Sequence, residues 1–90
     1  MKGQQIAYNK ENLYYVYNKS FDILNIYMIK NIVAVSEEIE KGVYLHFDVK
    51  DDTIVGITIE DYKFRKDLEK INDSLPIRLD FNYINSKIKE

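Results

Sequence analysis

Five short stretches of the chain are rich in β-branched and aromatic residues or alternate between hydrophobic and polar positions, and this pattern predicts five β-strands. Side chains along a strand point to opposite faces of its sheet, so alternation gives each strand one apolar face. The alternation is clearest over residues 43–49, where the apolar positions are Val43, Leu45, Phe47 and Val49. Short polar turns separate the stretches, so we expect consecutive strands to pair as an antiparallel meander. The five predicted strands span residues 13–17, 23–29, 32–40, 43–49 and 53–59.

The period of the apolar residues changes after residue 61 and becomes that of a helix. Apolar side chains recur every three to four residues, which predicts an amphipathic helix over residues 62–75. The residues of its apolar face are Phe64, Leu68, Ile71 and Leu75. Asp61 is placed to cap the first turn of this helix, and Pro76 is placed to end it. Alternation then returns over residues 77–83, which predicts a final strand.

These elements indicate an α+β fold, in which an antiparallel β-meander of about five strands is followed by one C-terminal amphipathic helix and a final strand. Ninety residues make one small domain, so we expect residues 1–90 to fold as a unit. The meander is expected to span residues 13–61. Residues 1–12 are polar and have no period, so they are expected to form a loose arm, and residues 85–90 are expected to fray.

Composition restricts the classes of protein to which the chain can belong. There is no cysteine, so disulfides and thiolate metal sites are excluded. The N-terminus has no continuous apolar segment of the kind found in signal peptides, and no apolar run approaches the roughly 20 residues that a membrane-spanning helix needs. We therefore expect a cytoplasmic protein that does not enter a membrane. A net charge of −2 argues against direct nucleic-acid binding.

The distribution of charge is more informative than the total. Residues 36–61 contain eight acidic and two basic side chains, a balance of −6, whereas residues 1–35 and 62–90 each have a balance of +2. Acidic residues on a strand often mark a solvated sheet edge that resists aggregation. An acidic face can also bind a basic protein partner. The residues predicted to form such a partner-binding surface are Glu38, Glu40, Tyr44, His46, Asp48, Asp51 and Asp52.

The chain offers few candidates for catalysis or metal binding. His46 is the only histidine, and Asp48 is expected to share its strand face, so this pair could form the general base of a small hydrolase. Asp51 and Asp52 are better explained by turn chemistry than by calcium, because the longer ligand series of a calcium loop is missing. We expect no catalytic residue, no cofactor and no metal.

Three segments of the chain follow a pattern in a fixed order: YNKSFDILNI over residues 17–26, GVYLHFD over 42–48 and IVGITIED over 54–61. Through these segments, from Tyr17 to Tyr62, the chain resembles the YuzE-like family of small bacterial domains. The resemblance implies an antiparallel sheet with a helix and no established active site, and some family members look like partners of small toxins. The positions at which this sequence departs from the Asp, Tyr, Asp and Glu of the family pattern are Asn18, Asn25, His46 and Thr58.

These observations favour a non-enzymatic protein-binding module, of an antitoxin-like or inhibitory kind, that presents an acidic sheet face to a basic partner. One alternative is a homo-oligomeric structural domain, and another is the small hydrolase built on His46 and Asp48. We also expect a homodimer, formed through the late strand over residues 77–83 or through a helix face.

Overall fold

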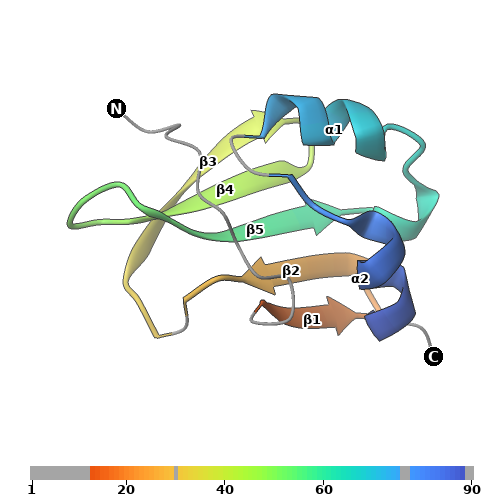
Figure 1. Ribbon diagram of the computed structural model, residues 1–90, viewed down its shortest axis with the longest axis horizontal. Coiled ribbons are helices and arrows are strands. Elements are labelled where there is room, and N and C mark those ends of the chain that lie inside the picture. Colours follow the sequence, from red (N-terminus) through yellow and green to blue (C-terminus); the bar gives the residue numbers. More distant parts are fainter. Residues whose placement is uncertain (1–12, 30, 76–77, 89–90) are drawn as a thin grey trace.

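The computed structural model describes residues 13–29, 31–75 and 78–88, so the arm expected over residues 1–12 lies outside the described residues. Five strands and two α-helices form an α+β domain (Figure 1). The five strands predicted from the pattern are all present, with ends shifted by a few residues. They are β1 (Tyr14–Asn18), β2 (Ile23–Tyr27), β3 (Ala34–Glu40), β4 (Val43–Asp48) and β5 (Ile54–Glu60).

The strands form one antiparallel sheet, but their order is β1-β2-β5-β4-β3 and not that of a meander. The hairpins β1–β2, β3–β4 and β4–β5 are as predicted. The predicted hairpin between the second and third strands is wrong, because β2 pairs with β5. Met28 and Ile29 continue along β5, where both amides donate to the Val55 carbonyl at 2.9 and 3.4 Å. The chain then crosses to the far edge, which gives the strand order of a Greek key.

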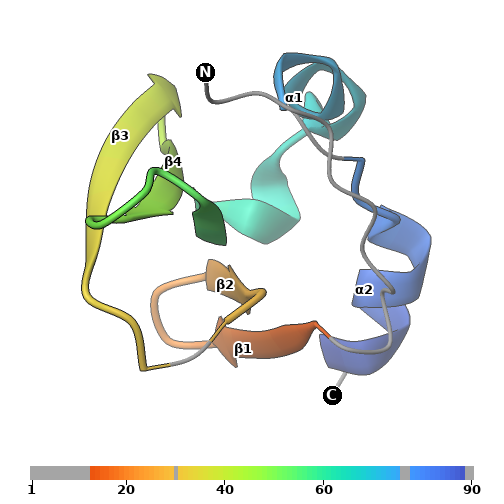
Figure 2. The ribbon, with the colours of Figure 1, turned by 60° about the vertical axis from the view of Figure 1, so that its left-hand side comes forward.

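One face of the sheet carries the hydrophobic core, and both helices cover that face (Figure 2). In the register of the central strands, Leu24 and Ile26 of β2 lie opposite Ile59 and Ile57 of β5. The predicted inward residues Val43, Leu45 and Phe47 of β4 are buried there as well. The other face is named here the open face, because neither helix packs on it. Its central residues are Asn25, Ser36, Glu38, Tyr44, His46, Gly56, Thr58 and Glu60.

The single helix predicted over residues 62–75 is divided into two short helices. The 3-10 helix η2 (Tyr62–Phe64) ends at Arg65, whose backbone is extended, and α1 (Leu68–Ser74) begins after it. Asp61 has a left-handed backbone with φ of 54° and makes no side-chain cap, so the predicted capping role is wrong. Phe64, expected on the buried face, is 82% exposed because the break turns it toward solvent.

The final strand predicted over residues 77–83 is also wrong, since Phe81–Ile88 form the helix α2. Phe81, Ile84 and Ile88 are buried, and their spacing is that of one helix face. Asp80 caps the helix, because its Oδ1 accepts the Tyr83 amide hydrogen at 3.1 Å. The frayed tail expected from residue 85 is therefore wrong as far as residue 88. The homodimer contact predicted through a strand over residues 77–83 is therefore not supported, because Phe81–Tyr83 are helical.

Among the described residues, neither helix is long and apolar enough to cross a membrane.

Candidate functional site

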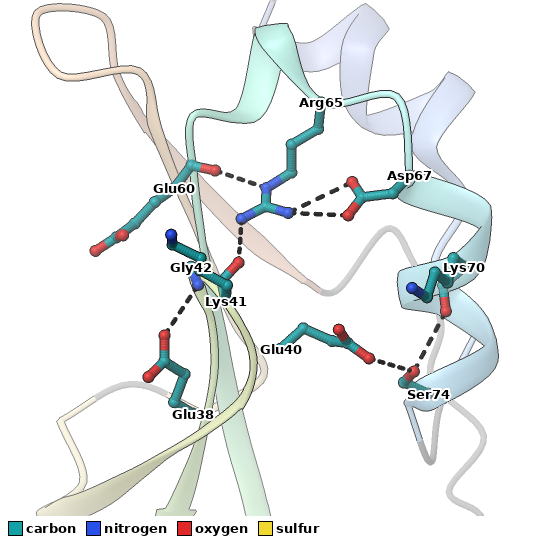
Figure 3. Close-up of polar contacts among 9 residues, drawn as sticks. All are labelled: Glu38, Glu40, Lys41, Gly42, Glu60, Arg65, Asp67, Lys70 and Ser74. Carbon is teal, nitrogen blue, oxygen red and sulfur yellow. Dashed lines mark hydrogen bonds and ion pairs between the residues drawn. The ribbon is translucent and has the colours of Figure 1, made fainter.

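The structure brings together part of the predicted acidic surface. Glu38, Tyr44, His46 and Asp48 all occupy open-face positions on β3 and β4. Glu40, however, turns to the helix-covered side, where Ser74 of α1 donates to its Oε2 at 3.3 Å (Figure 3). The register of β3 shifts between Glu38 and Glu40, and this bulge breaks the alternation that would place both on one face.

A tyrosine between two carboxylates is the centre of the acidic part of the open face. Tyr44 of β4 lies directly opposite Glu38 of β3 on one side and Thr58 of β5 on the other. The negative charges of Glu38, first, and of Glu60 raise the pKa of Tyr44. Glu60, two residues beyond Thr58, belongs to the acidic segment 36–61 but is not one of the residues predicted for the partner-binding surface. The pairing of β4 with β5 makes it a neighbour of Tyr44.

A row of hydrogen-bonded polar side chains crosses four strands at the middle of the open face. Ser36 Oγ lies 2.7 Å from Nδ1 of His46, and Thr58 Oγ1 lies 2.7 Å from Nε2. Thr58 in turn donates to Oδ1 of Asn25 at 2.5 Å. If the Thr58 proton goes to Asn25, then Nε2 must be the donor to Thr58, and the bare Nδ1 accepts the Ser36 hydroxyl. The row is therefore consistent with a neutral histidine.

The predicted pairing of His46 with Asp48 is wrong. His46 instead contacts side chains of the two neighbouring strands: Ser36, directly opposite it on β3, and Thr58, two residues along β5 from the opposite residue Gly56. Asp48 instead accepts the Lys50 amide hydrogen at 2.8 Å, and Asp51 accepts that of Thr53 at 3.0 Å. These bonds are the turn chemistry expected from the sequence. Asp52, at φ 63°, completes the same turn.

A small cavity of about 290 Å³ adjoins the polar row. Its floor is Gly56, where a Cβ atom would lie 3.1 Å from the Ile26 carbonyl oxygen and 3.3 Å from Cδ2 of His46. The missing side chain of Gly56 therefore allows the histidine ring to lie over β5. Among the described residues that line this cavity none is charged; the polar ones are Asn25, Tyr27, Asn31, His46 and Thr58.

Burial lowers the pKa of His46 below its ordinary value of 6.5. The unfolded chain therefore takes up a proton at higher pH than the folded protein does, and stability should fall as pH decreases through 6.5. We expect the free energy of unfolding of the wild type to decrease more between neutral and mildly acidic pH than that of His46→Gln, measured by urea titration. Equal pH dependence of the two proteins would contradict a neutral, half-buried histidine.

A second constellation surrounds Arg65, which the sequence did not single out. Its Nε donates to the Glu60 carbonyl at 2.7 Å and its Nη2 to the Lys41 carbonyl at 2.5 Å (Figure 3). Nη1 forms an ion pair with Asp67 at 3.2 Å. Arg65 thus ties the turn between β3 and β4 to the segment before α1. A cavity of about 620 Å³ lies beside it.

Two residues of the YNKSFD segment meet at another structural junction. Tyr17 donates to Oδ1 of Asp22 at 2.5 Å, and the Lys63 amide donates to both oxygens of that carboxylate at 3.1 Å. The hydrogen bond to Asp22 raises the pKa of Tyr17 to about 12. The junction joins the β1–β2 turn to η2, so Tyr17 and Asp22 stabilise the fold at this point.

The described residues contain no group of three or more histidine or acidic side chains that could hold a metal ion.

One of three comparisons with known proteins gave a match. Residues 15–63, more than half of the 90, match a family model described as protein of unknown function (DUF2283). Curated proteins and solved structures gave no match. The matched segment runs from β1 to η2 and stops before α1 and α2. The narrower YuzE-like grouping stays a prediction. The chain therefore belongs to the DUF2283 family, whose function is unknown.

Proposed function

We propose that this protein is a non-enzymatic protein-binding module whose acidic open face binds a basic partner. The observation that carries the proposal is the cluster of Glu38, Tyr44 and Glu60 on one sheet face, where both carboxylates raise the pKa of the tyrosine. Charge of a single sign speeds encounter with an oppositely charged partner, and a tyrosine in its midst supplies contact area for affinity.

Several contacts support binding over catalysis. Both ring nitrogens of His46 are engaged by hydroxyl groups and neither by a carboxylate, so no hydrogen-bonded carboxylate stabilises the imidazolium that a general base must become. Asp48 and Asp51 are engaged in turns. The resemblance to YuzE-like proteins motivates the narrower proposal that the module acts as an antitoxin or inhibitor. A homo-oligomeric structural domain is the competing reading.

Glu60 offers the sharpest test of the acidic face. Its backbone bonds to Gly42 and Arg65 do not depend on the side chain, so Glu60→Lys should remain folded. We expect this variant to bind a partner captured from the native lysate about tenfold more slowly at low salt, a loss that high salt removes. Tyr44→Ala should mainly speed dissociation. Association rates are measured by surface-based kinetics on the purified partner.

Glu69→Lys is the matched control, because it makes the same change of charge on α1. Its side chain is 80% exposed and forms an ion pair with Arg78, which is itself exposed, so the substitution should change stability little. We expect the control to associate at close to the wild-type rate. If Glu60→Lys and Glu69→Lys associate equally fast at low salt, the acidic face does not steer the partner.

A further inference from the structure

The outer edge of β3 carries backbone groups that no described strand pairs (Figure 2). The Val33 carbonyl accepts the Val49 amide hydrogen at 3.2 Å, so the backbone of Val33 faces β4. Successive residues of a strand direct their N–H and C=O groups to opposite edges. The backbone groups of Ala34, Ser36 and Glu38 therefore point away from the sheet, where no strand of the described residues pairs with them.

Three exposed valines lie beside this free edge. Val33, Val35 and Val49 are 77%, 51% and 54% exposed. Val35 lies opposite Phe47, which places its side chain on the same face as the core, as the alternation predicts. The helices do not reach it, because α1 contacts β3 near Glu40, at the other end of the strand. The valines therefore form an apolar strip on a correctly oriented but uncovered part of the sheet.

The charge of β3 determines which kind of strand the edge can accept. Its sequence, AVSEEIE, has three glutamates and no basic residue. Pairing β3 with β3 of a second copy along its full length would bring glutamates of both chains onto one ladder, and like charges facing each other are destabilising. Glu38 lies on the open face, opposite Tyr44. A strand that carries basic residues on that face would meet the Glu38 carboxylate.

We propose that β3 binds an extended segment of the basic partner by strand addition. Alternate residues of that segment are apolar and pack on the valine strip, and the residues between them are lysine or arginine. Backbone hydrogen bonds to Ala34, Ser36 and Glu38 supply affinity, and the alternating side chains supply specificity. The inference rests on the proposed function and names the partner's chemistry, an extended chain with alternating apolar and basic residues.

The first test uses a synthetic peptide of alternating lysine and valine with the full-length protein, followed by amide hydrogen exchange in NMR spectra. We expect slower exchange at Ala34, Ser36 and Glu38, and little change at Val35, whose amide already faces β4. A peptide of the same composition with lysines and valines in separate blocks should give no protection. No protection by the alternating peptide, or equal protection of Val35 and its neighbours, would overturn strand addition.

The second test is Ala34→Pro, which removes an outward-pointing amide hydrogen and places a ring at the edge. Proline is tolerated at the first residue of an edge strand, so thermal unfolding should be close to that of the control Ala34→Ser, which keeps the amide. We expect the proline variant to bind the alternating peptide at least about tenfold more weakly, a difference readily resolved in the dissociation constant. Equal binding by both variants would remove the proposal.

The outcomes separate this inference from the proposed function. If Glu60→Lys slows the natural partner and Ala34→Pro leaves its binding unchanged, the acidic face stands and strand addition is wrong. If only Ala34→Pro weakens binding, the edge is the site and the acidic face is not. Protection of Ala34 and Ser36 that rises with protein concentration, without peptide, would assign the edge to a second copy and overturn the proposed occupant.

Discussion

Replacing Arg65 by alanine is expected to lower the free energy of unfolding by about 1.5–3 kcal/mol, the range for hydrogen bonds to charged groups. The guanidinium donates to the carbonyls of Glu60 and Lys41 and is paired with Asp67, and its side chain is only 13% exposed. Its loss leaves two carbonyls without their donors and releases the turn between β3 and β4 from the segment before α1. Urea titration of the two proteins measures the difference.

Two variants separate the geometry of this contact from its charge. Arg65→Lys keeps the charge but cannot reach two carbonyls with a rigid fork, so its stability should lie between those of the wild type and the alanine variant. Asp67→Ala removes a partner that is 44% exposed, and we expect a much smaller effect. If Asp67→Ala costs as much as Arg65→Ala, the ion pair and not the carbonyl contacts holds the turn.

Gly42 gives an independent check on the same contact. Its φ is 81°, and a Cβ atom there would overlap Nη2 of Arg65. Gly42→Ala should therefore cost left-handed strain, roughly 1–2 kcal/mol, together with displacement of the arginine. In the Arg65→Ala background only the strain remains. A double-mutant cycle should give clear coupling between the two positions, and additive effects would contradict the contact.

The strands could be predicted from the sequence, whereas their order could not. Alternation identifies which face of β2 is apolar, and Leu24 and Ile26 would fit a neighbour on either side equally well. The choice of β5 over β3 depends on the bonds of Met28 and Ile29 to Val55, which alternation does not encode. Neighbouring strands in the chain usually pair, and here that tendency gives way to a crossover.

The predictions for the segments that form helices are wrong for a different reason. The spacing of apolar residues from Phe64 to Leu75 is helical, but Arg65 takes an extended backbone to reach the β3–β4 turn, and a tertiary contact of this kind overrides local pattern. For α2 a local signal existed. Phe81, Ile84 and Ile88 have helical spacing after Asp80, a favourable cap, but Leu79, Phe81 and Tyr83 also alternate with polar residues, which favours a strand.

The candidate site was predictable only where it depends on one hairpin. Glu38 and Tyr44 face each other across the β3–β4 turn, and the sequence placed both outward. The bond between Thr58 and Asn25 depends on the β2–β5 pairing, so no meander could contain it. Glu40 lies on the helix-covered side and not on the predicted surface, because β3 has a bulge that the alternating pattern of residues does not indicate. Neighbours within a predicted hairpin could thus be found from the sequence, and neighbours across the β2–β5 pairing could not.

Replacing Asn72 by alanine is expected to lower the free energy of unfolding by about 2–4 kcal/mol. Asn72 is 3% exposed and is the one buried polar residue of the described chain. Its amide nitrogen donates to the Leu79 carbonyl, and its amide oxygen accepts the Leu79 amide hydrogen, both at 2.8 Å. Alanine would leave both backbone groups unpaired in the interior. The loss is a large share of the roughly 5–15 kcal/mol that holds a small domain folded.

Asn72→Asp distinguishes hydrogen bonding from packing at nearly constant shape. A carboxylate can accept the Leu79 amide hydrogen but would repel the Leu79 carbonyl, and burial would raise the pKa of the new acid. We therefore expect Asn72→Asp to be strongly destabilised at neutral pH and to recover part of its deficit as pH falls and the acid becomes a donor. Asn82→Ala, at an exposed position of α2, should change stability by less than about 0.5 kcal/mol. If Asn72→Ala unfolds at the same urea concentration as Asn82→Ala, the two bonds to Leu79 do not hold α2 to the rest of the domain.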